Sequence, residues 1–141
     1  MTVSIEAAGA NGFLRLHVIR RTYPTAAFAE DRDWLTADVT LTADGRSARL
    51  TDTVLQSGEL AVWARQLESS NKMLVLSSAE PIVELVIDRK AGTCLVQLDL
   101  VPGEKEPVRA VLKELDLQTL LQHLRAALLV YPPQKEEADE A

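Results

Sequence analysis

The sequence has little of what covalent bracing, membrane insertion or secretion would require: it holds one cysteine and no long apolar run in 141 residues. Cys94 cannot form an internal disulfide, and its place in an alternating segment predicts a buried, unreactive thiol. No apolar run reaches the ~20 residues of a membrane span. The first residues show neither the basic nor the apolar region of a secretion signal. We therefore expect a cytoplasmic protein with no membrane partner.

The residues of catalytic and metal sites are also scarce. His17 and His123 have no ligand residue at metal-site spacing, and we expect both on the surface. The six glycines are scattered and form no phosphate-binding loop. Paired carboxylates such as Glu84 and Asp88 would lie about 13 Å apart on a strand, too far to share one glycosidic bond. We predict no catalytic residue, no metal, no cofactor and no enzymatic activity.

Positive charge is outnumbered as well. Fifteen Lys and Arg against 21 Asp and Glu give a formal net charge of -6. Binding to nucleic acid needs a clustered positive surface, so we predict no nucleic-acid partner. Part of the acidic excess lies in residues 134–141, which we predict to be a disordered tail after a single domain of residues 1–133.

Apolar and polar residues alternate in many segments of the chain, and this pattern is typical of strands with one buried face. Residues 34–43 and 46–55 flank Asp44-Gly45, which predicts a tight hairpin turn. A slip of one residue would move Leu50 to the polar face, so burial determines the register. The predicted cross-strand pairs are Ala43 with Arg46, Leu41 with Ala48, Val39 with Leu50, Ala37 with Asp52, Leu35 with Val54, and Trp34 with Leu55.

The rest of the chain predicts more strands and two helices. The remaining predicted strands cover 13–21, 72–77, 82–88, 93–101 and 107–115. Apolar residues at helical spacing predict one helix with Ser57 as its N-cap and Trp63 in its buried stripe. A second helix should run from Asp116 to Tyr131. The predicted fold is α+β, an antiparallel sheet of six or seven strands with two helices packed on one face.

The other face of that sheet would be open to water, and it is the predicted binding surface. It is mostly polar, with apolar interruptions at Val86, Leu95 and Val111. Trp34 would either cover the end of the core or contact a partner. The alternative is an ordinary exposed sheet face. The candidate partner-binding residues are Trp34, Asp38, Arg49, Glu84, Asp88 and Asp99.

Four segments together resemble the WapI-type immunity proteins of bacteria. They are Trp34 with its hairpin, Glu59–Leu67 with its central Trp, Gly92–Val96, and Asp116–Leu120. The resemblance covers about residues 34 to 131. It implies a protein that neutralises a cognate contact-dependent toxin by binding it in the cytoplasm of the producing cell. It supplies no catalytic residues.

Other functions stay open at this point. A small acidic secretion chaperone or adaptor would bind client segments, often as a homodimer. A small hydrolase would need a concave pocket lined by convergent polar groups. A purely structural domain is a further alternative. The favoured function is noncatalytic binding of a protein partner, with a homodimer left open.

Overall fold

The computed structural model describes residues 1–78, 80, 82–100 and 106–134. Their strands form two antiparallel sheets of four strands each. We call the sheet ordered β1-β2-β3-β4 sheet A and the sheet ordered β5-β6-β7-β8 sheet B. The elements are β1 (Val3–Gly9), β2 (Gly12–Arg21), α1 (Ala29–Arg32), β3 (Trp34–Ala43), β4 (Arg46–Gln56), α2 (Ser57–Glu68), β5 (Met73–Ser77), β6 (Val83–Asp88), β7 (Thr93–Leu98), β8 (Val108–Leu112) and α3 (Leu117–Val130).

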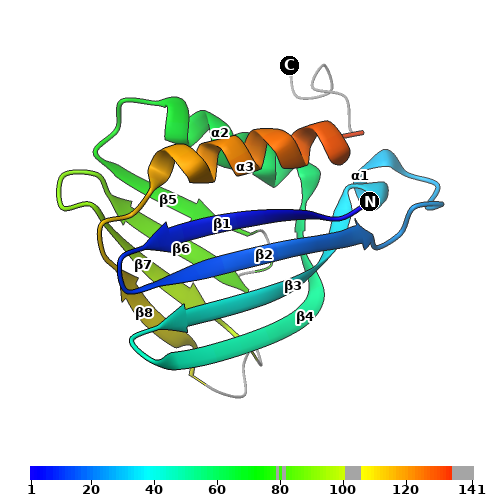
Figure 1. The fold of residues 1–141 in the computed structure, drawn as a ribbon. Coiled ribbons are helices and arrows are strands. Elements are labelled where there is room, and N and C mark those ends of the chain that lie inside the picture. The colour runs from blue at the N-terminus through cyan, green and yellow to red at the C-terminus, as the bar shows by residue number, and fades with distance from the viewer. Residues whose placement is uncertain (79, 81, 101–105, 135–141) are drawn as a thin grey trace.

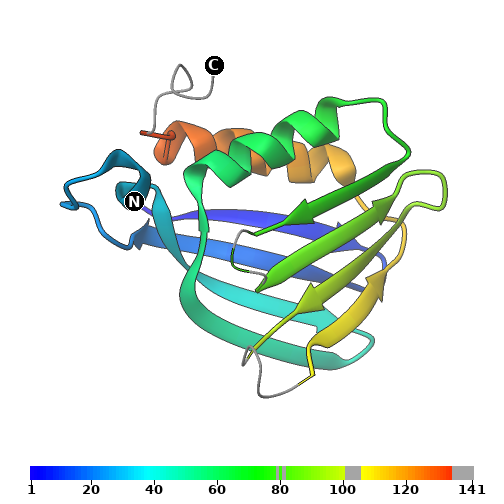
Figure 2. The ribbon, with the colours of Figure 1, turned by 180° about the vertical axis from the view of Figure 1, so that it is seen from behind.

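The two sheets face one another, and their strands cross obliquely (Figures 1 and 2). Helix α3 lies along β1, and α2 lies beside α3 near β5, so the helices cover the gap between two edge strands. The predicted single sheet of six or seven strands with helices on one face is therefore wrong. Alternation shows that a strand buries one face, but it does not show what covers that face. Here α2 carries the chain from β4 to β5, which begins a second sheet.

A single core lies between the sheets and beneath the helices. Trp63 of α2 is buried in it as predicted, and its indole N–H donates to the Ser77 carbonyl at 3.2 Å. Cys94 faces the same core, where burial raises the pKa of its thiol to about 12. Large side chains that are almost fully buried come from both sheets and both long helices: Ile5, Leu14, Leu35, Leu55, Leu60, Leu76, Leu85, Ile87, Leu98, Leu112 and Leu124.

Strand β1 was not predicted, and both histidines form hydrogen bonds with it. They are therefore half-buried rather than fully exposed. His17 Nδ1 lies 2.7 Å from the Ser4 hydroxyl, and His123 Nδ1 accepts a hydrogen bond from the Glu6 backbone N–H at 3.1 Å. Ser4 and Glu6 both belong to β1. His123 thereby satisfies an amide on the outer edge of sheet A and attaches α3 to it.

The hairpin register is confirmed from Ala43–Arg46 back to Ala37–Asp52. Asp44 and Gly45 have φ of 51° and 79°, as the tight turn requires. A bulge then shifts the pairing, so Leu35 pairs with Leu55, and Trp34 pairs with Gln56 rather than with Leu55. The extra residue of the bulge allows two consecutive side chains of β4, Val54 and Leu55, to be buried together.

Of the two predicted N-caps, that of α2 is wrong and that of α3 is confirmed. Helix α2 begins at Ser57, so its N-cap is Gln56, whose backbone N–H donates to the Glu59 carboxylate at 2.8 Å. Ser57 was predicted to be this cap, but β4 continues directly into the helix and leaves Ser57 inside its first turn. Asp116 is the N-cap of α3 as predicted, and it accepts from the Thr119 backbone N–H at 3.0 Å. Hydrogen bonds from Thr119 lower the pKa of Asp116.

The turn between β1 and β2 connects the two sheets. The Asn11 side chain accepts from the Lys113 backbone N–H at 2.8 Å and donates to the Val111 carbonyl at 2.8 Å. Ala10 adds a backbone hydrogen bond to the Lys113 carbonyl at 2.7 Å. These bonds satisfy part of the open edge of β8. They hold sheet B against the end of sheet A.

None of the helices in the described ranges has the length and apolar character needed to cross a bilayer. Of the predicted tail, 134–141, only Gln134 belongs to the described residues.

At Gly12 the backbone of β2 lies very close to the backbone of β3. A Cβ at this position would lie 2.0 Å from the Thr42 carbonyl oxygen, which belongs to the backbone of β3. We expect Gly12→Ala to lower the free energy of unfolding by about 1 to 3 kcal/mol, as overpacking does. Denaturant unfolding would measure the change.

Gly58→Ala is the matched control, because a Cβ there meets no atom within 4 Å. Alanine favours the helix, so the control should keep or raise stability by up to about 1 kcal/mol. Equal losses in both variants would contradict the packing argument.

Candidate protein-binding surfaces

The six residues predicted to bind a partner do not share one face. Asp38 and Arg49 lie on the outer face of sheet A, and Trp34 begins the same strand as Asp38. Glu84 and Asp88 lie on the outer face of sheet B. The two outer faces point away from each other because the inner faces form the shared core (Figures 1 and 2). The prediction of one open face is corrected to two.

Asp99 lies just past the end of β7. Its backbone N–H donates to the Ile82 carbonyl at 2.8 Å. Its Oδ1 is buried and has no hydrogen-bond partner within the described ranges.

The outer face of sheet A is polar. Arg49 and Asp38 form an ion pair across β3 and β4 at 3.7 Å, and the Thr51 hydroxyl donates to the same carboxylate. The pair borders a shallow depression of about 290 Å³. Its lining residues, all polar or charged, are Ser4, Arg15, His17, Asp38, Thr40 and Arg49. Such a face can form hydrogen bonds and ion pairs with a partner across several strands.

An aromatic surface adjoins this face at the start of β3. Trp34 lines a depression of about 520 Å³ together with the connection between β2 and β3, including Tyr23 and Asp31. Tyr23 is 52% exposed and Phe28, in the same connection, is 66% exposed. Sequence reasoning did not single out Tyr23 and Phe28, which lie between two predicted strands. Their signal was two large aromatic residues in a segment with no alternation to bury them.

The outer face of sheet B is more apolar than predicted. The apolar residues Val86, Leu95 and Val111, expected as isolated interruptions, are direct cross-strand neighbours. Val75 of β5 extends the same line, because it pairs with Val86. Glu84 and Asp88 flank this line on β6, and the Asp88 carboxylate also accepts backbone N–H groups of the following turn. The line could not be seen without knowing how β5 to β8 pair.

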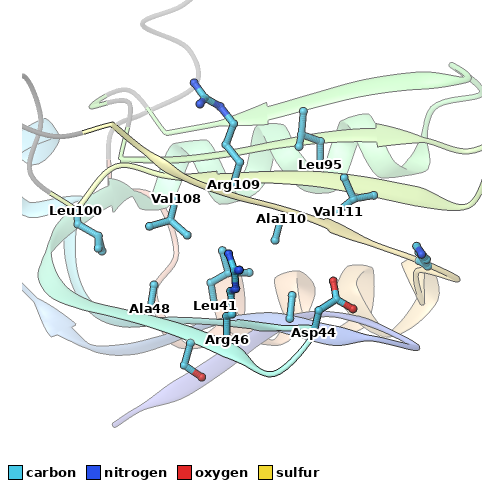
Figure 3. A pocket seen from close by; sticks show the side chains of 13 residues that line it. Leu41, Asp44, Arg46, Ala48, Leu95, Leu100, Val108, Arg109, Ala110 and Val111 are labelled. Carbon is cyan, nitrogen blue, oxygen red and sulfur yellow. The ribbon is translucent and has the colours of Figure 1, made fainter.

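A groove of about 780 Å³ separates β8 from the β3–β4 hairpin. Figure 3 shows Val108 and Ala110 pointing toward Leu41 and Ala48, whereas Leu95, Arg109 and Val111 point away from the hairpin. The groove exists because β4 and β8 end their sheets without pairing. Within the described ranges, no group of three or more His, Cys, Asp or Glu is arranged to hold a metal ion.

Comparison with known proteins identifies the family. The model of the WapI-like immunity proteins matches residues 5–132. The chain belongs to this family. The match confirms the resemblance and extends it to include β1 and β2, which precede Trp34. No curated protein matches the chain. No solved structure matches it either.

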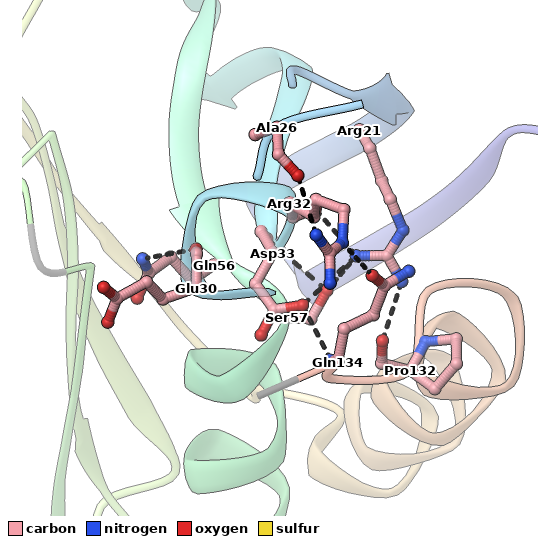
Figure 4. Close-up of polar contacts among 9 residues, drawn as sticks. All are labelled: Arg21, Ala26, Glu30, Arg32, Asp33, Gln56, Ser57, Pro132 and Gln134. Carbon is pink, nitrogen blue, oxygen red and sulfur yellow. Dashed lines mark hydrogen bonds and ion pairs between the residues drawn. The ribbon is translucent and has the colours of Figure 1, made fainter. Parts of the chain in front are cut away.

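In this member of the immunity family, a buried polar cluster holds the end of α3 against β2 and α1 (Figure 4). Arg21 and Asp33 form an ion pair at 3.4 Å, with side chains only 13% and 5% exposed. Arg21 also donates to the Pro132 carbonyl at 2.7 Å, and Asp33 accepts from the Gln134 backbone N–H at 2.8 Å. The ring of Tyr131 lies 5.8 Å from the guanidinium, and burial raises the pKa of this tyrosine. Because its contacts are internal, the cluster is structural.

We expect Asp33→Asn to lower the free energy of unfolding by about 3 kcal/mol, because it leaves the buried Arg21 without its counter-charge. Denaturant unfolding at neutral pH would measure the loss. Asp31→Asn, at an exposed position in α1, is the control and should change stability by less than about 0.5 kcal/mol. A loss for Asp33→Asn no larger than that of the control would contradict the structural role.

Proposed function

We propose that this protein is an immunity protein that neutralises a cognate toxin by binding it, without catalysis, in the cytoplasm of the cell that makes both. The observation that carries the proposal is the family match over residues 5–132. It includes both sheets and both long helices. The whole folded unit, rather than one motif within it, is therefore what the family shares.

We infer that the toxin binds to the outer face of sheet A and the adjoining aromatic connection. Trp34 and Asp38 lie four residues apart on β3, about 13 Å along the strand, so one partner can contact both. Exposed Tyr23 and Phe28 extend the surface beyond the end of the sheet. Interfaces combine aromatic contact residues with a polar surround, and this surface has both.

The charge of the chain favours a basic toxin. The net charge of -6 would attract a cationic partner over a distance and raise the association rate. Within the proposed surface, Asp38 and Arg49 form an ion pair, so the contact itself can match charges of both signs. We expect the association rate constant to fall as salt concentration rises.

The function is tested by co-expression with toxin domains encoded beside the gene. We expect the full chain to restore growth of cells that express one of these domains and to form a stable complex with it. Binding of many unrelated unfolded segments instead would favour an adaptor. Failure to protect against every neighbouring toxin domain would overturn the proposal.

The binding surface is tested by Trp34→Ala. We expect it to weaken the toxin complex by at least about 2 kcal/mol, roughly 30-fold in Kd, because truncating a central aromatic contact has such effects. Titration calorimetry with the purified complex partners would measure this. Leu129→Ala is the control, since Leu129 is an exposed apolar residue on α3, outside the proposed surface. Wild-type affinity in the Trp34 variant, with neutralisation intact, would place the contact elsewhere while leaving the function standing.

A further inference from the structure

The outer face of sheet B carries an apolar row that crosses all four of its strands, and three of its four members are exposed whereas Val86 is half-buried. Val75 pairs with Val86, Val86 with Leu95, and Leu95 with Val111, so the four side chains are successive cross-strand neighbours. Val75 is 50% exposed, Leu95 40% and Val111 44%. Met73 stands beside Val75 on β5 and is also exposed. A continuous apolar row of this kind marks an interaction surface better than single exposed residues do.

Each side of the apolar row carries one acidic and one basic residue. On one side, Glu84 of β6 and Arg109 of β8 lie in the same cross-strand line, with Gln97 between them. On the other side, Asp88 ends β6, and Lys113 follows β8 by one residue. Thus β6 carries an acid on each side of the row, whereas β8 carries a base on each side. These four charges sum to zero, in contrast to the acidic chain as a whole.

We propose that this face binds a second copy of the same chain around a two-fold axis that runs parallel to β7 through Leu95. Rotation about this axis places β6 of one subunit over β8 of the other and Leu95 over the partner's Leu95. Glu84 then faces the partner's Arg109, and Asp88 faces the partner's Lys113. Each of these contacts is made twice, as a two-fold interface requires.

The charge pattern favours this arrangement over a face-to-face dimer whose two-fold axis runs along the apolar row. A two-fold axis along the apolar row would place β6 over the partner's β6 and bring Glu84 against the partner's Asp88. Like charges in direct opposition are unfavourable. Arg109 is available for the proposed contact, because its hydrogen bond to Gln97 uses Nε alone. The guanidinium has two further nitrogens that can bind a carboxylate.

The same pattern favours a second copy over another occupant. Two chains with a net charge of -6 repel each other, and this neutral, self-complementary face lets them approach without a like-charge contact. With the axis along β7, three strands, β6 to β8, and three lines of side chains face the partner, an overlap roughly 10 to 15 Å on a side. This is smaller than a standard interface, so we expect a reversible dimer that forms as concentration rises. The proposed toxin surface lies on sheet A, so the two contacts do not compete.

Sedimentation velocity of the full chain from about 1 μM to about 1 mM tests the dimer. We expect the wild type to shift from monomer toward dimer across this range. Leu95→Arg places two cations on the axis and should raise the dimer Kd at least about tenfold. Val62→Arg is the control: Val62 is also 40% exposed but lies on α2, and this variant should dimerise as the wild type does. Circular dichroism checks that each variant is folded.

Charge reversal tests the register of the two subunits. Glu84→Arg and Arg109→Glu should each weaken the dimer, because each creates like-charge contacts across the interface. The double variant E84R/R109E exchanges the two charges and should regain at least half of the wild-type dimer fraction. A second copy in the proposed orientation predicts this recovery, whereas binding of an unrelated partner does not.

Three results would overturn the proposal. They are a wild type that stays monomeric at all concentrations, a dimer that Leu95→Arg leaves intact, and a double variant that dimerises no better than the single ones. A monomeric wild type whose toxin neutralisation is lost in Leu95→Arg would assign this face to the toxin instead. The co-expression test uses the wild-type chain and does not require a dimer. The proposed function and the proposed dimer can therefore fail separately.

Discussion

The rest of the structure depends on burial of one face of each sheet against the other. Sheet A and sheet B each expose a polar or mixed outer face and bury an apolar inner face in one common core. Full burial of a Leu, Ile or Val side chain is worth about 1.5 to 3 kcal/mol, so the many inward residues together outweigh any single polar contact. Neither sheet could remain folded with its inner face in water, and each therefore requires the other.

Three local arrangements close the sides of this two-sheet core. Helices α2 and α3 cover the gap between β1 and β5, and His123 satisfies an edge amide of β1. The pair of Arg21 and Asp33 holds the chain that leaves α3. Asn11 joins the turn after β1 to the edge of β8. Among the described residues, the side between β4 and β8 stays open as a groove.

Because the core uses the inner faces, both outer faces remain free for binding, and their chemistry differs. Sheet A presents charged and hydroxyl side chains beside exposed aromatics, which suits a specific partner protein. Sheet B presents an apolar row between balanced charges, which suits a second copy. Two separate surfaces on opposite sides would let one chain self-associate and bind a toxin at the same time.

Much of the local structure could be predicted. The hairpin around Asp44-Gly45, the Asp116 cap and the buried Trp63 follow from interactions between residues near in sequence or from periodicity. Strand β1 was missed because only Ile5 and Ala7 mark its buried side, and much of it is small residues. The pairing at the start of β3 was predicted wrongly because a bulge shifts the register there. The bulge depends on packing in the core and not on the residues of the turn.

The sequence by itself determined which side of each strand and helix is apolar, where the tight turn lies and, through its pattern, the immunity family. Only the tertiary structure decided that the strands divide into two sheets, and so which outer residues are neighbours. The physical reason is that alternation records whether a side chain is buried, whereas the identity of what buries it depends on contacts between segments far apart in the chain. For this reason Val75, Val86, Leu95 and Val111 form one row, whereas Asp38 and Glu84, predicted on one face, lie on opposite sides of the molecule.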